Sequence, residues 1–366
     1  MDKSKIFILT NMIPEYRIDF YKRLEKKYDI NLYTSSSVKG VNIPDSSSKL
    51  RCVRLIRYVG LHDEKFGIQL LPLWTLIIKQ YDFYVIYGNP RIITNVILSL
   101  ILKLFSKRII IWGQYGFNES PSRPRSLRLA WWKLFNNFFV YNRNEEIAFH
   151  KDLTSSKDKF VVGMNNGLDN RKVIKPFHFK KDNDHIKILA IGRHVKKNKY
   201  EILIKALAHL RASDYVDIQV TFIGDGPEKE KLLALAIKLG VENNITMLGE
   251  IYDERRLAEN FYVSDFLVHP GGVGLSVVHG FQYGLPTITS NVIRGQMPEY
   301  SYIDHLSTGY KYGGEEEGLA AAIIDFHSYQ KQNRDEIRKQ CLEVAERCNT
   351  KNMFINFTRL IELITR

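Results

Sequence analysis

Residues 268–291, which read VHPGGVGLSVVHGFQYGLPTITSN, constrain the fold more than any other stretch of this sequence. A Pro-Gly-Gly turn opens a predicted helix of about ten residues, which ends at Gly284-Leu285-Pro286 before a short apolar strand, 287–289. Glycine lets the backbone approach a ligand closely, and the amides and dipole of a helix N-terminus favour a phosphate or diphosphate. The stretch therefore predicts an anion site, with a plain strand-to-helix turn as the alternative.

Apolar runs typical of buried parallel strands alternate with helical patterns along the rest of the chain. The strand-like runs are 6–9, 83–87, 109–112, 186–192, 218–224 and 245–248, and the helical patterns cover 18–27, 92–105, 199–210, 227–239 and 352–366. Such alternation is typical of an α/β fold, in which helices cover both faces of a parallel sheet. Because the pattern restarts after the polar stretch 179–185, we expect two Rossmann-like domains, 1–172 and 186–349, followed by a last helix at 350–366.

The basic character of the chain belongs to its first half. Residues 1–180 carry 30 Lys and Arg against 15 Asp and Glu, whereas residues 181–366 carry 23 against 25. Such an excess attracts an anionic partner, which we expect to be the inner-membrane surface or a phosphorylated lipid. No nucleic-acid-binding motif accompanies the charge, so nucleic acid is not expected as a partner. A merely soluble basic surface is the alternative.

Two segments bear on membranes. The run 121–141, PSRPRSLRLAWWKLFNNFFVY, mixes basic and aromatic residues, so it predicts either a helix at a lipid interface or a core element. The segment 92–105 is too short to span a bilayer and is predicted to be a buried helix.

Three cysteines, Cys52, Cys341 and Cys348, form neither a disulfide framework nor a metal-ligand pair, and the last two are interpreted as packing residues. The start of the sequence, MDKSKIFILT, is typical of a strand and not of a signal peptide. These features predict a cytoplasmic protein, peripheral on the inner face of the cell membrane.

Glycine follows three of the strands expected in the second half. The three sites are Gly192-Arg193, Gly224-Asp225-Gly226-Pro227 and the turn 270–274. Ligands of open α/β sheets bind at the carboxyl ends of the strands. The three turns therefore predict one shared ligand site.

In order and spacing, about 110 residues of the second half resemble the nucleotide-sugar-binding domain of retaining glycosyltransferases of family 4, which have the GT-B architecture. The matching segments are IGR at 191–193, LIKA at 203–206, IGDGP at 223–227, LG at 239–240, MLG at 247–249, SDFLVHP at 264–270, VGL at 273–275 and YGLP at 283–286. In the first half, NMIPEYR at 11–17 and WGQYG at 112–116 are similar to a subgroup that assembles bacterial surface polysaccharide, such as O-antigen or capsule.

This resemblance implies an α/β GT-B fold, with two Rossmann-like domains whose parallel sheets face a central cleft and a C-terminal helix that crosses back to the first domain. It also implies a hexosyltransferase that retains anomeric configuration. The donor would be a UDP-, GDP- or dTDP-sugar, and the acceptor an undecaprenyl-diphosphate-linked saccharide. No tightly bound cofactor and no metal are expected.

The sequence departs from the family at two carboxylates. Family members have two glutamates eight residues apart, and the aligned positions are Gly271 and His279. We therefore expect the backbone amides of Gly271, Gly272 and Val273 to contact the sugar in place of the first glutamate. His279 is expected to bond the ribose in place of the second, with a role in the helix interior as the alternative.

The sequence also departs at the lysine that follows the family's arginine, where it has Asn198 between Lys197 and Lys199. Arg193 keeps the predicted catalytic role of a forked donor to the departing diphosphate. The full set of predicted donor contacts is Gly192, Arg193, Lys197, Lys199, Gly226, Gly249, Gly271, Gly272, Val273, Gly274, Leu275, His279 and Glu299. For Glu299, a helix-start carboxylate is the alternative.

The acceptor side is predicted from the loops that follow first-half strands. Glu15 and Glu119 are candidates for a catalytic base or for binding sugar hydroxyls, and the acceptor contacts are assigned to Tyr16, Arg17, Gln114 and Tyr115. The Asp-Asn-Asp sequence at 182–184 has the D-x-D form of metal sites in another glycosyltransferase fold, but it precedes a strand and is set aside. The remaining alternatives are a catalytically inactive nucleotide-sugar-binding scaffold and a sugar-nucleotide epimerase or hydrolase of GT-B type.

Overall fold

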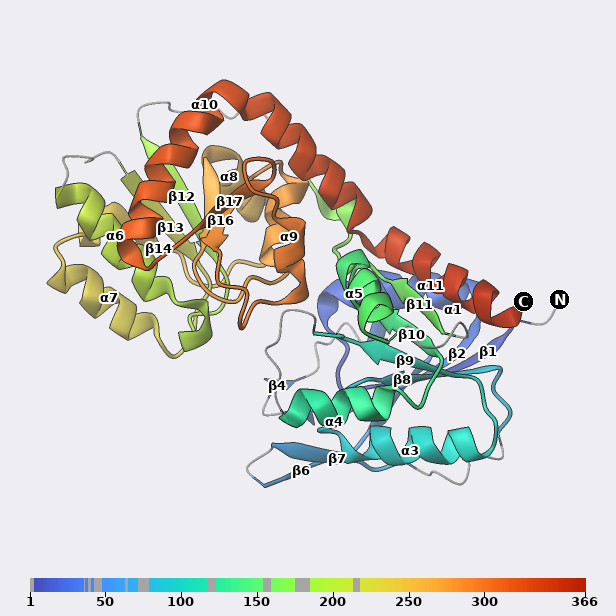
Figure 1. The fold of residues 1–366 in the computed structure, drawn as a ribbon. Coiled ribbons are helices and arrows are strands. Elements are labelled where there is room, and N and C mark those ends of the chain that lie inside the picture. The colour runs from blue at the N-terminus through green and yellow to red at the C-terminus, as the bar shows by residue number, and fades with distance from the viewer. Residues whose placement is uncertain are drawn as a thin grey trace. The chain divides into compact units, whose positions relative to one another are not determined.

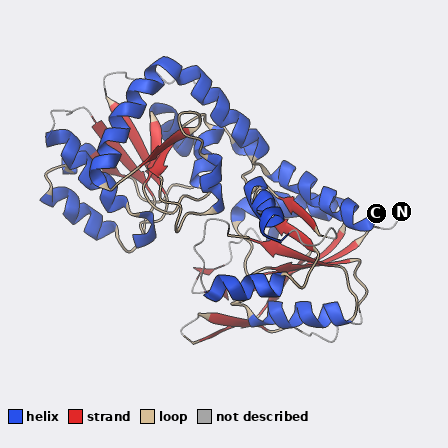
Figure 2. Cartoon of the chain, in the orientation of Figure 1, coloured by secondary structure: helices blue, strands red, loops and turns tan. Residues whose placement is uncertain are grey.

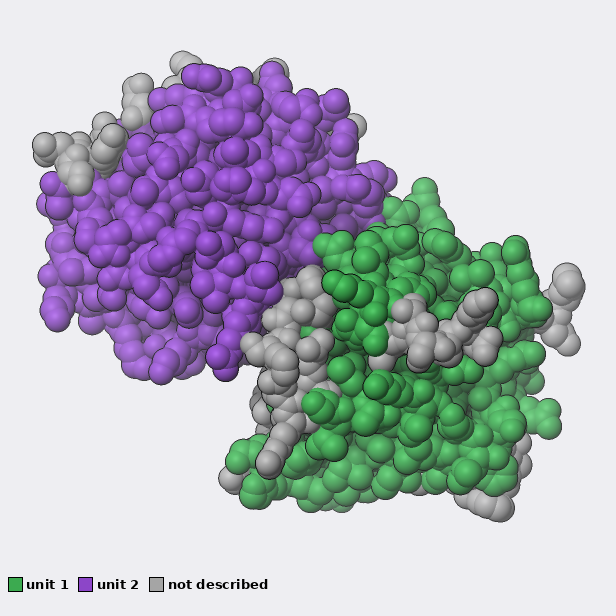
Figure 3. Space-filling view, viewed as in Figure 1, with its two compact units in different colours: residues 1–166, 350–366 green, residues 167–349 purple. Residues whose placement is uncertain are grey.

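The computed structural model describes residues 3–35, 37–38, 41–42, 48–62, 65–71, 79–116, 123–153, 159–174, 185–212 and 218–366. The chain forms two compact units, Met1–Asn166 with Thr350–Arg366 and Gly167–Asn349 (Figure 3). The boundary between the units lies at 166/167, beside the predicted domain end at 172. The final helix belongs to unit 1.

Unit 1 is built on a parallel sheet in the order β11-β10-β9-β8-β1-β2-β5. Figure 2 shows the strands in red. Its strands are β1 (Lys5–Thr10), β2 (Asp29–Ser35), β5 (Val53–Ile56), β8 (Phe83–Tyr87), β9 (Ile109–Gly113), β10 (Asn137–Val140) and β11 (Phe160–Gly163). Two antiparallel pairs accompany it, β3 (Ser37–Val38) with β4 (Val41–Asn42) and β6 (Tyr58–Leu61) with β7 (Phe66–Gln69).

The helices of unit 1 pack on this sheet (Figure 1). They are α1 (Ile18–Lys27), α3 (Ile93–Leu104), α4 (Arg123–Trp132), α5 (Arg143–Leu153) and α11 (Thr350–Thr365). Helix α11 buries Met353, Phe357 and Leu360 in the same core cluster as the residues of β1 and α1. The sequence predicted this helix from its apolar spacing, because residues three and four apart share one face.

Two predictions about unit 1 need correction. The run 121–141 is not one helix, because α4 ends at Trp132 and β10 begins at Asn137. Of the two alternatives for its aromatic residues, the core one is confirmed, since Trp132 and Phe138 are fully buried. The segment 92–105 does form a helix, α3, but only one of its faces is buried as predicted: Leu98 and Leu102 are fully buried, whereas Leu104 is exposed.

Unit 2 is a second parallel sheet, in the order β14-β13-β12-β15-β16-β17. Its strands are β12 (Ile186–Ile191), β13 (Ile218–Ile223), β14 (Ile245–Met247), β15 (Phe266–His269), β16 (Thr287–Ser290) and β17 (Gly309–Tyr312). Its helices are α6 (Tyr200–Ala212), α7 (Lys229–Lys238), α8 (Glu254–Val263), α9 (Ser276–Gln282) and α10 (Glu316–Arg347).

The predicted α/β class with parallel sheets is therefore confirmed. Cys341 and Cys348 are buried in the main core cluster of unit 2, as the packing interpretation predicted. Helix α9 is shorter than predicted, with seven residues, because residues 270–275 remain a turn. Among the described residues, no helix combines the length and apolar composition needed to cross a membrane.

Candidate functional site

Unit 2 has a topological switch point between β12 and β15. Strand β12 pairs with β13 on one side and with β15 on the other, so the connections leave β12 and β15 in opposite directions. Open α/β sheets bind ligands at the carboxyl ends of strands at such a point. The loops that meet there are 192–199, after β12, and 270–275, after β15.

These two loops are joined backbone to backbone. The Gly271 amide donates to the Asn198 carbonyl and the Gly272 amide to the Lys197 carbonyl, both at 3.1 Å. A Cβ at Gly271 would lie 2.1 Å from the Lys197 oxygen, so only glycine fits at this position. At Gly274 an added Cβ would meet nothing within 4 Å. Gly271 therefore closes the junction between the loops, whereas Gly274 faces open space.

The loop after β12 carries four exposed cations around a buried amide. Arg193, Lys196, Lys197 and Lys199 are exposed, whereas Asn198 is buried. The Asn198 side chain donates to the Arg193 carbonyl at 2.7 Å, and its own carbonyl accepts from Gly271. Asn198 thus fastens the loop from inside, which gives a structural reason for an uncharged residue where the family has lysine.

The predicted sugar contacts of three amides are wrong. The amides of Gly271 and Gly272 are engaged by the neighbouring loop, and the Val273 amide donates to the Gln296 side chain at 2.9 Å. The amides that follow, of Gly274, Leu275 and Ser276, lead into α9, whose N-terminal amides have no acceptor within the helix. Because α9 has only seven residues, its dipole adds less than the ten-residue helix that the sequence predicted.

A carboxylate from another helix lies against His279. His279 is on α9, and its Nε2 is 2.9 Å from Oε1 of Glu254, the first residue of α8. The Tyr283 hydroxyl donates to the same oxygen at 2.6 Å. Burial alone raises the pKa of the Glu254 carboxyl, but the hydrogen bonds from His279 and Tyr283 outweigh it, so the net pKa lies below its ordinary value. Glu254 is therefore an ionised carboxylate that the sequence analysis missed.

Buried polar rings pack behind Gly192. His194, Tyr200 and His269 are at most 5% exposed, and the Tyr200 and His269 rings lie 5.6 Å apart. The Tyr200 hydroxyl and the Nδ1 of His269 have no hydrogen-bond partner among the described residues. Burial lowers the pKa of His269 to about 4 and also lowers the pKa of His194. Both rings are therefore neutral at physiological pH.

Three further predicted donor contacts have distinct surroundings. Gly226 follows β13 and sits against the His194 backbone, where a Cβ would come within 2.5 Å of the His194 oxygen. Gly249 follows β14, and its carbonyl accepts from the Gly224 amide at 2.8 Å. Glu299 is 2% exposed in a 3₁₀ helix, Pro298–Tyr302, so it lies inside unit 2 rather than on a donor-facing surface.

The acceptor residues predicted in unit 1 differ in exposure. Glu15 is exposed and Tyr16 and Gln114 are half-buried. Arg17 is 5% exposed, with its guanidinium 4.7 Å from the centre of the Trp112 ring and its Nη2 3.4 Å from the Asn166 amide oxygen.

For two other predicted residues of unit 1, Tyr115 and Glu119, the structure gives no support for acceptor contact. Tyr115 is a core residue whose hydroxyl donates to Asp152 at 2.8 Å, so its predicted contact with an acceptor is wrong. Glu119 and the Asp-Asn-Asp sequence at 182–184 lie outside the described residues.

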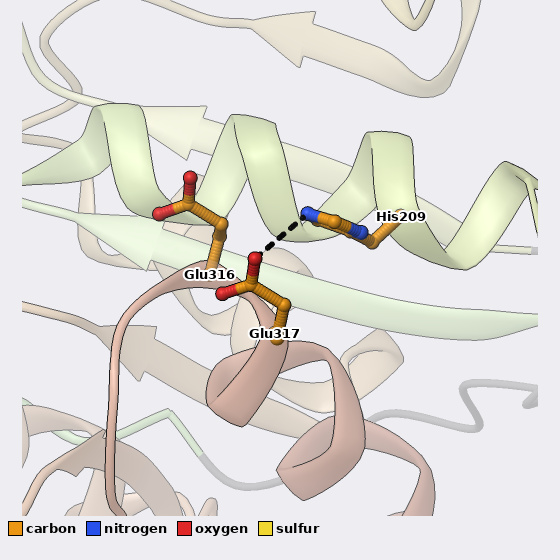
Figure 4. Close-up of side chains that lie close together, drawn as sticks. All are labelled: His209, Glu316 and Glu317. Atoms are coloured by element: carbon orange, nitrogen blue, oxygen red, sulfur yellow. Dashed lines mark ion pairs between the residues drawn. The ribbon is translucent and has the colours of Figure 1, made fainter.

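One group of side chains in unit 2 has metal-ligand character. Ligand atoms of His209 on α6 and of Glu316 and Glu317 on α10 lie within 4.8 Å of one another (Figure 4). The Lys205 ammonium already donates to Glu316 at 3.2 Å, and the His209 Nε2 lies 3.6 Å from Glu317. The Lys205 ammonium therefore already pairs with the Glu316 carboxylate. Ion pairs between α6 and α10 explain why these side chains lie together.

Comparisons with known proteins agree with this geometry. Residues 172–343 match the family model for glycosyl transferases group 1. The chain is 33% identical to protein CapJ of Staphylococcus aureus over 34% of its own length and 33% of that protein. It is 25% identical to the N-acetyl-alpha-D-glucosaminyl L-malate synthase of Bacillus anthracis over 50% of its own length and 42% of that enzyme. The alignments with these two relatives thus span less than half of each of them.

Among solved structures, the chain is similar to Anabaena HepE in complex with UDP. The TM-score is 0.71 at 15% identity, and the alignment covers 98% of this chain and 99% of that one. Two α/β units, each built on a parallel sheet, define the GT-B fold. The segment that matches the model for glycosyl transferases group 1, residues 172–343, contains the switch point described above.

Proposed function

We propose that the protein is a retaining glycosyltransferase of family 4 that moves a sugar from a nucleotide-sugar donor to a lipid-linked saccharide during bacterial polysaccharide synthesis. One observation carries the proposal: the loops after β12 and β15 meet at the switch point of a glycosyltransferase group 1 domain. Exposed cations surround this junction, and glycine at 274 leaves it open.

The donor diphosphate is assigned to the junction of the two loops. Arg193, with Lys197 or Lys199 beside it, would pair with the phosphate oxygens, because an exposed guanidinium is a forked donor to such groups. The complex of HepE with UDP supports a uridine nucleotide as the first donor to test. Glu254, held by His279 and Tyr283, would accept hydrogen bonds from the ribose or sugar hydroxyls in place of the missing glutamates.

The transfer breaks the bond between the anomeric carbon and the diphosphate oxygen and forms a bond to an acceptor hydroxyl. Positive charge develops on the sugar and negative charge on the departing phosphate. Arg193 would stabilise that phosphate, and loss of one such donor typically costs about 3 kcal/mol of transition-state stabilisation. The acceptor proton can pass to the departing phosphate, so the reaction needs no carboxylate at position 271.

The acceptor is assigned to unit 1. Its basic surface favours an anionic acceptor such as an undecaprenyl-diphosphate-linked saccharide at the inner face of the membrane. Glu15, Tyr16, Gln114 and Arg17 are the described residues proposed to contact it. O-antigen or capsule is the proposed product class.

Nucleotide release tests the proposal. We expect purified protein to release UDP, GDP or dTDP from its cognate sugar nucleotide only when an acceptor saccharide is supplied. Arg193→Ala should reduce kcat by at least about a hundredfold, whereas Arg334→Ala, at an exposed position on α10, should not change it. Release without acceptor would indicate a hydrolase, and binding without any release would indicate an inactive scaffold. Analysis of the product's anomeric configuration decides whether the reaction retains it.

A further inference from the structure

Helix α3 exposes apolar side chains to solvent. Three residues share its outer face at spacings of three and four, and they are 45%, 37% and 83% exposed: Ile97, Leu100 and Leu104. Phe105, which follows the helix, is 52% exposed. Single exposed apolar residues are ordinary on protein surfaces, but a contiguous set marks an interaction surface.

The inner face of the same helix is partly polar. Asn95 donates to the Tyr87 carbonyl at 2.8 Å, and Thr94 donates to the Gln69 carbonyl at 2.9 Å. Ser99 is fully buried and accepts from the indole of Trp131 at 3.0 Å. The inner face thus mixes these polar residues with Leu98 and Leu102, which are fully buried in the core, whereas the outer face exposes apolar side chains. Apart from Lys103, the exposed positions of α3 are apolar, whereas the water-facing side of a surface helix is ordinarily polar.

Helix α4 lies beside α3 (Figure 1), and the Trp131 indole on α4 donates to Ser99 on α3. Leu127 is 70% exposed, and Leu134, just after the helix, is 43% exposed. The Lys103 ammonium on α3 donates to the Leu134 carbonyl, so Leu134 lies beside the exposed end of α3. We name this set the α3–α4 surface and define it as Ile97, Leu100, Leu104, Phe105, Leu127 and Leu134.

Basic residues dominate the sequence that contains α3 and α4. Between residues 83 and 144 the sequence contains nine Lys and Arg and one acidic residue, Glu119. Lys103, Arg108 and Lys133 are exposed beside the apolar side chains. A second copy of the same surface would bring like charges together, which disfavours self-association. A bilayer with anionic headgroups matches both the exposed apolar side chains and the positive charge.

We propose that the α3–α4 surface docks the protein on a bilayer that contains anionic phospholipid. The leucine, isoleucine and phenylalanine side chains enter the boundary between headgroups and acyl chains, while the lysines and arginines pair with lipid phosphates. The inference goes beyond the proposed glycosyl transfer, because it assigns the membrane contact to named residues. Its test uses no transfer reaction.

The test measures sedimentation of the full chain with vesicles. Wild-type protein should bind vesicles of phosphatidylglycerol mixed with phosphatidylcholine, bind phosphatidylcholine alone more weakly, and dissociate from the mixed vesicles as salt screens the charge. The double variant Leu104→Glu/Leu127→Glu should bind the mixed vesicles at least about tenfold more weakly. The matched control is Ile237→Glu/Ile355→Glu, which changes the net charge by the same amount. Its two positions are 66% and 47% exposed and lie outside the α3–α4 surface. The control should bind like wild type.

The uncharged pair Leu104→Gln/Leu127→Gln separates lost apolar contact from added negative charge, and should also bind more weakly. Circular dichroism checks that each variant is folded. Equal binding by the α3–α4 variants and the control would overturn the proposal, as would equal binding of wild type to neutral and mixed vesicles. Concentration-dependent dimerisation that Leu104→Glu/Leu127→Glu abolishes would also overturn it, since the surface would then be a contact between copies. Each outcome is independent of whether the protein transfers sugar.

Discussion

Acidification should destabilise unit 2 through His269. This ring is 5% exposed at the end of β15, and burial lowers its pKa to about 4 from an ordinary value of 6.5. The folded state therefore holds the neutral ring, while the unfolded state binds a proton below about pH 6.5. Stability should fall as pH decreases from about 7 to about 4 and then level off with respect to this group.

The size of the effect follows from the two pKa values. At about 1.4 kcal/mol per unit, the full difference corresponds to about 3 kcal/mol of unfolding free energy. Between pH ~8 and pH ~5, the same linkage gives a loss of about 2 kcal/mol. His194, whose pKa burial also lowers, adds a loss of the same sign. The contribution of His269 is therefore measured as the difference between wild type and His269→Asn, which cannot titrate there.

The tryptophans allow the two units to be followed separately. All four of them, Trp74, Trp112, Trp131 and Trp132, belong to unit 1. Tryptophan fluorescence in urea thus reports unfolding of unit 1, whereas far-ultraviolet circular dichroism reports both units. Wild type should lose about 2 kcal/mol more than His269→Asn between pH ~8 and pH ~5 in the transition assigned to unit 2. His209→Asn, at an exposed position in the same unit, should behave like wild type.

Parallel pH profiles for wild type and His269→Asn would refute this reasoning. They would show that the ring is protonated in the folded state or reaches water on the timescale of the measurement. A difference confined to the fluorescence transition would refute it equally, because that transition belongs to unit 1.

Three further outcomes follow from the site. Gly271→Ala should lower the unfolding free energy in urea by more than about 2 kcal/mol, since the added methyl would meet a backbone oxygen at 2.1 Å; Gly274→Ala should change it by less than about 1 kcal/mol, and equal losses would contradict the packing described. Glu254→Gln should raise KM for the donor at least threefold with a smaller change in kcat, and an unchanged KM would remove the carboxylate from donor binding. Arg17→Gln should raise KM for the acceptor while the thermal shift caused by UDP stays the same; a lost UDP shift would assign Arg17 to the donor or to folding.

Much of the fold follows from local patterns. The predicted strand 83–87 and helix 18–27 have the same bounds as β8 and α1 in the structure, because apolar runs and amphipathic spacing report which residues need burial. Strand β10 was misassigned to a helix, since a short aromatic run fits either period. Helix α3 was misjudged because an apolar sequence predicts burial but does not identify what covers each face.

Local sequence patterns also indicated only part of the candidate site. Gly192, Arg193 and the turn at 270–274 were predicted because glycines at the ends of parallel strands indicate a ligand site. Glu254 was missed, since 25 residues separate it from His279 and no local pattern links them. The role of Asn198 was also missed, because a buried asparagine and an exposed one look alike in sequence.

By itself the sequence determined the strand–helix alternation, the glycine turns and the basic character of the first half, because each depends on residues close together in the chain. Only the tertiary structure decided that Glu254 meets His279, that three amides near 271 are already engaged, and that α3 and α4 present a shared apolar face. These features depend on how helices and loops distant in sequence pack together, which local residue preferences do not specify.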